Sequence, residues 1–281
     1  MITFVNDVKR VANFWLRSGD TSSANNFIGF FEDTMANFGT KKVGLVQLDS
    51  GFFQKDILDY LEQKRLNHII AVRFTHPIQN LINKQDLWIS INDGIEICDK
   101  EYQANSWDKN RRIVIVRQKM SERPNATGRT LSLFPEDKLH RNYRYSAYVT
   151  NLEYAATDVW RNYRQRGDAE NRIKELKSDF GAESFNLKDF FPTEAALIFS
   201  MIAYNLMSLF KIFVLQEKTQ KTQKTQKTLS TLRYRTFTVG AYFEKVGDTI
   251  KLKIALTKKR RKWFESIWDG PIDLTKEIPN A

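Results

Sequence analysis

The stretch 163-YRQRGDAENRIKELK-177 places an aromatic hydroxyl, cations and a carboxylate at regular intervals. On a helix with about 100° per residue, four of its side chains fall within an arc of roughly 60°: Tyr163, Arg166, Glu170 and Lys177. They would form one stripe about 21 Å long. A carboxylate flanked by two cations at this spacing suits a phosphate chain that runs along the helix. The alternative is an exposed helix whose cations pair with the Glu, which adds only ~0.2–0.5 kcal/mol per pair.

A second acidic candidate follows a short apolar run. The run 43-VGLVQL-48 has the pattern of a buried strand, and Asp49-Ser50-Gly51 comes directly after it. We therefore expect the strand to present Asp49 at its C-terminal tip. A helical pattern over 55–65 and another apolar run over 69–74 come next. This alternation of strand, helix and strand predicts an α/β layer with a partly parallel sheet.

The spacing Tyr-x2-Arg-x3-Glu-x6-Lys resembles the signature of a large group of bacterial insertion-sequence transposases. In that family the Glu is the last member of an Asp-Asp-Glu triad. The segment 47-QLDSGF-52 is similar to the family's second-Asp segment, in which an acidic residue precedes a small residue, Gly and an aromatic. The resemblance covers most of residues 1–215. It implies an RNase H-like mixed sheet flanked by helices, with a β-rich insertion before the Glu-bearing helix.

The resemblance also implies metal-dependent DNA chemistry. Cutting a phosphodiester and joining the freed 3′-hydroxyl to a new strand require an activated attacking oxygen and a stabilised leaving oxygen. Two divalent cations about 4 Å apart do both, and Mg²⁺ prefers oxygen ligands. By this resemblance Asp49 and Glu170 are catalytic residues and metal ligands of a two-Mg²⁺ site. Three further side chains would hold phosphates of the transposon end: Tyr163, Arg166 and Lys177.

One part of the family pattern is not matched. The family's first Asp lies on the first strand of the sheet, immediately before a hairpin, and this sequence begins at that hairpin. Asp7 falls in its turn and Asp20 in a later loop, so neither matches. The family's N-terminal DNA-binding region is not matched either. We therefore expect a C-terminal part of a transposase with an incomplete two-metal site, inactive by itself.

Changes of pattern along the chain divide it into five segments. From residue 76 to 144, short alternating runs and turn residues replace helical periodicity, which favours a β-rich segment. Three copies of Lys-Thr-Gln follow the Glu-bearing region and are typical of a polar linker. The predicted segments are the first part of the core at 1–75, the insertion at 76–144, the second part of the core at 145–216, the linker at 217–230 and a basic C-terminal segment at 231–281.

Two helix predictions come from local pattern. Ser22 and Ser23 can cap a helix over 24–38, with Gly39 where helices stop. The apolar run 195-AALIFSMIAYNLMSLFKIFVL-215 is long enough to span a bilayer. Its Asn205 and Lys211 would be costly at mid-membrane depth. We therefore expect a buried core helix and no membrane partner.

The overall charge favours a polyanionic partner. The 281 residues contain 44 Lys and Arg against 33 Asp and Glu, which gives a formal charge of +11. DNA fits this balance, although a merely basic, solvated surface would also explain it. The single cysteine, Cys98, excludes an intrachain disulfide. No secretory signal pattern is present at the N-terminus, and we expect a cytoplasmic protein.

Other residues carry weaker signals. Trp88 and Trp107 can stack on an unpaired base or pack in a core. The cluster 258-KKRRK-262 can contact a phosphate backbone or simply begin a solvated helix. The three histidines have no metal-ligand spacing: His68, His76 and His140.

Three functions compete. The first is a transposase core acting on transposon ends as a homodimer or paired with a full-length transposase. The second is a catalytically inactive remnant that binds DNA or inhibits full-length transposase. The third is the product of a decaying gene. An Asp-bearing strand encoded upstream of Met1 would separate the first from the others.

Overall fold

The computed structural model describes residues 1–22, 24–92, 94–120, 133–134, 140, 142–215 and 229–269. The predicted linker at 217–230 lies outside the described residues, apart from its last two. The chain divides into two compact units. The first consists of Met1–Thr3 and the described residues of Asn13–Gly167, and the second of Phe4–Ala12 and the described residues from Asp168 onward.

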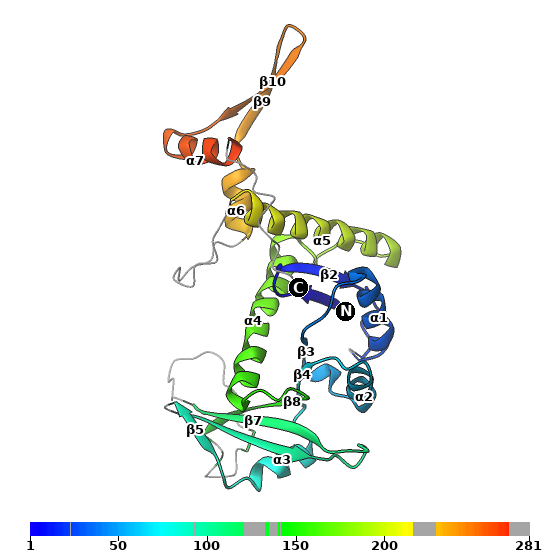
Figure 1. Ribbon diagram of the computed structural model, residues 1–281. Helices are drawn as coiled ribbons and strands as arrows, with labels where there is room; N and C mark the ends of the chain where they lie inside the picture. Colours follow the sequence, from blue (N-terminus) through cyan, green and yellow to red (C-terminus); the bar gives the residue numbers. More distant parts are fainter. Residues whose placement is uncertain are drawn as a thin grey trace. The chain divides into compact units, whose positions relative to one another are not determined.

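A six-stranded sheet forms the centre of the first unit (Figure 1). Its order is β3-β4-β8-β7-β6-β5. β3 and β4 are parallel, whereas the other neighbours are antiparallel, so the sheet is mixed as predicted. The strands are β3 (Val46–Leu48), β4 (His68–Ala71), β5 (Ile89–Asn92), β6 (Ile95–Tyr102), β7 (Arg111–Lys119) and β8 (Tyr143–Thr150).

Helices lie on both faces of this sheet. They are α1 (Phe27–Phe38), α2 (Lys55–Gln63), α3 (His76–Asn83) and the first part of α4 (Ala156–Asp179), with the short 3₁₀ helix η1 at Ser50–Phe52. Because side chains alternate along a strand, β7 contributes to two cores. Ile113 and Ile115 pack with α1, α2 and α3, whereas Val114 packs with Val159 and Trp160 of α4. The first unit is therefore layered as α/β/α.

The strands predicted between residues 76 and 144 join the same sheet. β7 pairs with β6 on one side and with β8 on the other, and β8 pairs in turn with β4. The same range contains the helix α3, which the sequence pattern did not predict. β5 forms the edge of the sheet, and its pairing with β6 shifts register between Ser90 and Asn92. The division of this range from the core as a separate insertion stays a prediction.

Helix α1 begins later than predicted. Its N-cap is Asn26, which has a left-handed backbone (φ 57°) and no side-chain capping bond. The carbonyl of Ser22 instead accepts hydrogen bonds from Arg17 and from the backbone of Asn25. Capping by Ser22 is therefore wrong, and Ser23 lies outside the described residues. The predicted stop at Gly39 is confirmed, since this residue takes φ 61°, a conformation that favours glycine.

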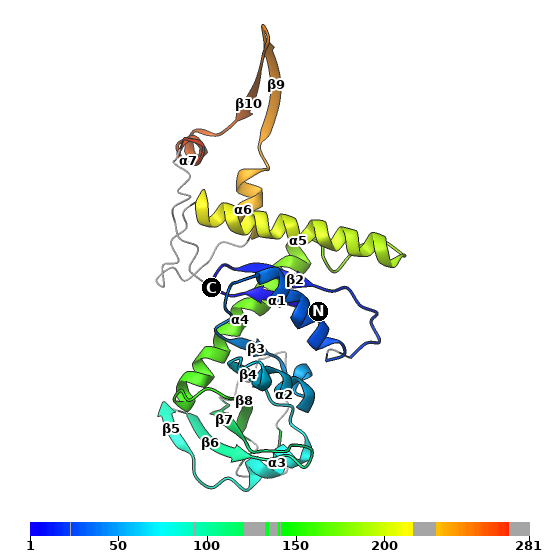
Figure 2. The ribbon, with the colours of Figure 1, turned by 45° about the vertical axis from the view of Figure 1, so that its right-hand side comes forward.

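The second unit is built from helices and two hairpins (Figure 2). Part of the first hairpin belongs to it: Phe4 and Val5 of β1 (Ile2–Val5) and Arg10–Ala12 of β2 (Arg10–Phe14). The second hairpin is an antiparallel ribbon of two strands. The remaining elements are the last part of α4, α5 (Phe190–Phe213), α6 (Leu229–Thr236), β9 (Gly240–Val246), β10 (Thr249–Ala255) and α7 (Lys258–Trp268).

Tyr204 of α5 lies at the centre of this unit. Its side chain is fully buried, with ring centroids 5.9 Å from Phe4 and 5.7 Å from Phe180. The neighbouring Asn205 bonds the backbone of β2 twice, because its amide accepts from the Val11 N–H at 2.9 Å and donates to the Val11 carbonyl at 2.9 Å. Asn205, which would be costly in a membrane, therefore joins a helix to a strand edge here.

The expectation of a buried core helix over 195–215 is wrong. By length and apolar composition α5 would suffice to cross a bilayer, but only 22% of its most apolar stretch is buried. Phe191 and Phe199 are 79% and 72% exposed. One face of α5 packs, and the opposite face is open within the described part of the chain. An apolar run predicts that a helix can be buried, but it does not predict how many faces of that helix pack against other elements.

Candidate active site

Asp49 lies where the sequence places it, directly after the last residue of β3. It is the N-cap of η1, and its Oδ1 accepts a hydrogen bond from the Gly51 N–H at 2.8 Å. This bond fixes the carboxylate at the tip of the strand. The side chain remains 48% exposed, so the carboxylate is accessible to a ligand.

Helix α4 brings the second motif to the same strand tip. Tyr163 donates its hydroxyl proton to the Leu48 carbonyl at 3.2 Å. One turn later, Arg166 Nη2 lies 3.4 Å from Asp49 Oδ2. A third contact runs from Gln47 Nε2 to the helix backbone, at 2.9 Å from the carbonyl of residue 162. Segments 115 to 117 residues apart are thus joined at one point.

Aromatic packing orients the Tyr163 and Arg166 side chains. The Tyr163 ring lies against Tyr148 of β8, with centroids 4.5 Å apart. The Arg166 guanidinium carbon is 5.8 Å from the Tyr163 ring centroid. The Arg166 side chain is only 20% exposed, and its guanidinium group reaches Asp49. The arrangement presents a cation and a carboxylate side by side at the sheet edge.

Glu170 and Lys177 continue along the same helix. α4 has no break between Ala156 and Asp179, so Glu170 comes one turn after Arg166, a rise of about 6 Å. Both side chains are exposed, as a metal or phosphate ligand would need to be. They belong to the second compact unit. The proximity of Glu170 to Asp49 stays a prediction, as do the roles of all five residues.

Other charges in the opening stretch form a buried network that the sequence pattern did not predict. Arg172 is buried and lies 3.5 Å from Asp168 and 3.1 Å from Glu175. Asp168 also pairs with Lys9 at 2.6 Å. Burial opposes ionisation of Asp168, but the cations Lys9 and Arg172 outweigh it and lower its pKa. The pairs of Arg172 with Asp168 and Glu175 could have been predicted, because opposite charges three and four residues apart meet on a helix. No local signal predicted that Lys9 would pair with Asp168.

The two remaining acidic candidates lie outside regular elements. Asp7 is exposed in the turn between β1 and β2. Asp20 is exposed in a turn after β2, where a hydrogen bond from Ser18 lowers its pKa. Among the described residues, no group of three or more His, Cys, Asp or Glu side chains is placed to hold a metal ion. Asp49 and Glu170 have the carboxylate oxygens that Mg²⁺ prefers as ligands.

The two tryptophans of the sheet region are packing residues. Trp107 is 6% exposed and meets Phe53 and Tyr102 edge to face. Trp88 packs against Tyr145, and the Arg117 guanidinium lies 4.3 Å from its ring centroid. Both rings have protein partners, which favours packing over stacking on a base.

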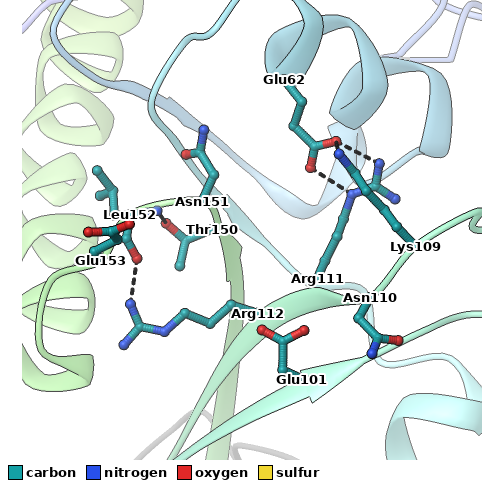
Figure 3. Close-up of a pocket in the computed structure, with 10 residues that line it drawn as sticks. All are labelled: Glu62, Glu101, Lys109, Asn110, Arg111, Arg112, Thr150, Asn151, Leu152 and Glu153. Carbon is teal, nitrogen blue, oxygen red and sulfur yellow. Dashed lines mark hydrogen bonds and ion pairs between the residues drawn. The ribbon is translucent and has the colours of Figure 1, made fainter.

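A cavity of about 340 Å³ lies near the ends of β7 and β8 and does not include Asp49 (Figure 3). Arg111, one of its lining residues, is buried and bonds Glu62 at 2.7 Å and also Asp59. Burial opposes ionisation of Glu62, but bonds from Arg111 and Lys109 lower its pKa. The charges around this cavity neutralise one another, so they tie α2 to β7 and leave no excess charge for a ligand.

A layered α/β/α unit with a mixed sheet, an acidic residue at a strand tip and a basic helix beside it is compatible with an RNase H-like DDE fold. The family profile of the transposase DDE domain, group 1, matches residues 1–269. The chain therefore belongs to the DDE transposase family. DDE transposases generally use divalent metal ions. A comparison with curated proteins found no match.

Proposed function

We propose that this chain is the catalytic part of an insertion-sequence transposase that cleaves DNA strands and transfers them at transposon ends. The observation that supports this most is the junction of two motif segments, in which Arg166 contacts Asp49 and Tyr163 contacts Leu48. In a family that acts on DNA, this junction puts a carboxylate beside a phosphate-binding cation. We propose cytoplasmic action, with a homodimer or a full-length transposase as partner.

Asp49 and Glu170 would be the metal ligands. When bound, Mg²⁺ ions supply activation of the attacking oxygen and stabilisation of the leaving oxygen. Asp49 is held for this role by the Gly51 N–H on Oδ1, and Arg166 lies beside its Oδ2. Three side chains would hold phosphates of the transposon end beside the carboxylates: Tyr163, Arg166 and Lys177.

We further propose that Asp49 and Glu170 do not complete the site without a third carboxylate. Without one carboxylate of a two-metal site, the barrier should rise by several kcal/mol, which is roughly a thousandfold or more in rate. The chain alone would then bind DNA without cutting it. The alternative function is that of an inactive DNA-binding remnant or an inhibitor of full-length transposase, and the same incomplete carboxylate set supports it.

Metal binding tests the ligand assignment without requiring activity. Mn²⁺ titration followed by electron paramagnetic resonance, with a DNA duplex present, should show a site that Asp49→Asn and Glu170→Gln each weaken. Asp86→Asn is the matched control, because Asp86 is an exposed acid in a loop. Equal Mn²⁺ binding by all four proteins would reject Asp49 and Glu170 as ligands.

Activity tests the third carboxylate. Nicking and strand transfer on a duplex carrying the element's own ends would be measured for this chain and for a version extended by an Asp-bearing strand before Met1. We expect activity from the extended protein alone, abolished by Glu170→Gln. Activity of the shorter chain that is lost on Asp7→Ala or Asp20→Ala would show that its own residues complete the triad.

A further inference from the structure

The elements after α6 carry an excess of positive charge that the catalytic site does not use. Residues 240–268, which cover β9, β10 and α7, contain eight Lys and Arg against three Asp and Glu. This excess of five is nearly half of the formal +11 of the whole chain, in about a tenth of its length. A concentration of this kind suits a polyanion and not merely a soluble surface.

Helix α7 holds five of these cations in its first five residues, Lys258–Lys262. The N-terminus of a helix is its positive end, so cations there are unfavourable unless an anion is bound. Arg260 lies 5.6 Å from the ring centroid of Tyr234 in α6. Within the residues that the structure describes, none of the five forms an ion pair with a carboxylate. No residue of α7 is buried. Packing inside the protein therefore does not explain why five cations occur together here.

The β9–β10 ribbon adds lysines next to α7. The register pairs Lys251 with Glu244 and Lys253 with Tyr242, so these four side chains share one face. Lys253 also lies 3.2 Å from Glu244, which offsets part of the charge. The opposite face carries Lys245 among exposed apolar side chains: Phe243, Ile250 and Leu252. A two-stranded ribbon of this kind fits the major groove of duplex DNA.

Hydrogen bonds attach α6, the helix that precedes the β9–β10 ribbon and α7, to the Glu-bearing helix α4. The Ser230 N–H donates to Asp179 Oδ2 at 3.0 Å, and Arg233 donates to the Asp179 carbonyl at 2.6 Å. Both bonds join α6 to the last residue of α4. In Figures 1 and 2 the ribbon extends away from α6, and α7 lies near its base. The cations therefore belong to a projecting arm anchored at the end of α4.

We infer that the β9–β10 ribbon and α7 form a second DNA-binding surface, which holds the phosphate backbone of duplex DNA without reading its sequence. The inference rests on the proposed function for its choice of DNA as the polyanion. It assigns a role to residues outside the catalytic stripe. Lys258, Lys259, Arg261 and Lys262 would contact phosphates, while Arg260 keeps α7 against α6.

The test is duplex binding by the full chain, measured by fluorescence anisotropy on a random-sequence 30-base-pair probe between 50 and 200 mM KCl. One variant replaces four cations of α7: Lys258→Gln, Lys259→Gln, Arg261→Gln and Lys262→Gln. We expect a loss of affinity of about tenfold or more, and a salt slope reduced by up to about 3 to 4, since each lost phosphate contact lowers the slope by about one.

A matched control removes four exposed lysines from the first unit: Lys41→Gln, Lys42→Gln, Lys84→Gln and Lys100→Gln. It makes the same change in net charge, so an equal loss of affinity in both variants would overturn the inference. An unchanged salt slope in the α7 variant would also overturn it. Circular dichroism of both variants checks that the fold is retained.

A second copy of the chain is the competing occupant of this arm, because the ribbon has an exposed apolar face. Sedimentation velocity on the α7 variant and on Phe243→Ser separates the two. Loss of a dimer in either variant with DNA affinity unchanged would reject DNA as the partner. These outcomes are independent of the Mn²⁺ and cleavage experiments, which test the carboxylates of the catalytic site.

Discussion

At the scale of single residues, Arg166 links the structural and the chemical parts of the site. It reaches Asp49 at 3.4 Å and lies beside the Tyr163 ring. The Asp49 carboxylate is nearly half exposed, and ion pairs of this kind contribute only about 0.2–1 kcal/mol to stability. We therefore propose that Arg166 binds a phosphate and contributes little to stability.

Arg166→Gln should separate these two roles. We expect the free energy of unfolding, measured by urea denaturation, to fall by about 1 kcal/mol or less. Affinity for a transposon-end duplex should fall by about tenfold, because a charge-assisted phosphate contact is lost. Lys174→Gln, on the same helix, is the control. If the stability and not the affinity of Arg166→Gln collapses, Arg166 is a structural residue.

His68 should make stability dependent on pH. Its side chain is fully buried, its Nδ1 lies 3.3 Å from the Leu66 carbonyl, and burial lowers its pKa. When a histidine has a lower pKa in the folded protein than in the unfolded chain, falling pH protonates it in the unfolded chain before it does so in the folded protein. Stability should therefore be full above pH ~6.5 and decline as the pH falls below that value.

The measurement is urea denaturation of wild type and His68→Gln at pH 7.5, 6.5 and 5.5. We expect the stability difference between the two proteins to shift in favour of His68→Gln as the pH falls. A constant difference across the three pH values would show that His68 does not titrate on unfolding.

At the scale of elements, the sequence predicts those helices and strands whose pattern lies within a few neighbouring residues. The apolar run before Asp49 and the helix after it were sufficient to predict β3, α2 and β4, including the parallel pairing. Helix α3 was missed, although Thr75 precedes it and Pro77 lies in its first turn, which is a recognised start signal. The signal was overlooked because the alternating pattern over residues 76–144 favoured strands.

Contacts between distant segments could not be predicted from the sequence. Arg111 bonds Glu62 across 49 residues, and Lys9, near the N-terminus, pairs with Asp168 in the middle of the chain. No propensity or spacing rule acts over such separations, because the partners are chosen by packing. The meeting of Asp49 with Arg166 was expected only because a family motif contains both.

Helix α5 offers a direct test of one-sided burial. Phe199 is 72% exposed and Tyr204, five residues later, is fully buried. We expect Phe199→Ser to change the free energy of unfolding by about 0.5 kcal/mol or less, and Tyr204→Ala to reduce it by about 3–5 kcal/mol. Chemical denaturation of both variants measures this. Comparable losses would mean that Phe199 is covered in solution.

At the scale of the whole molecule, we expect net charge to control association with DNA. The chain has a formal charge of +11. Each phosphate that a cation neutralises releases counterions, so affinity falls as salt rises. We expect wild-type affinity for unrelated duplexes to fall by roughly 10³ or more between 50 and 200 mM salt if six or more phosphates are contacted. A flat response in a salt titration would contradict electrostatic binding.

The register shift in β5 has a consequence for the behaviour of the protein in concentrated solution. An edge strand exposes unpaired backbone groups and invites pairing with another chain, which leads to aggregation. β5 is such an edge. Its first residue, Ile89, and Leu87 just before the strand are 67% and 81% exposed, and residues 85–92 contain no Lys or Arg. The irregular step between Ser90 and Asn92 interrupts the ladder that an incoming strand would need. We therefore expect this irregularity to limit edge-to-edge pairing at a strand that has no Lys or Arg to prevent it.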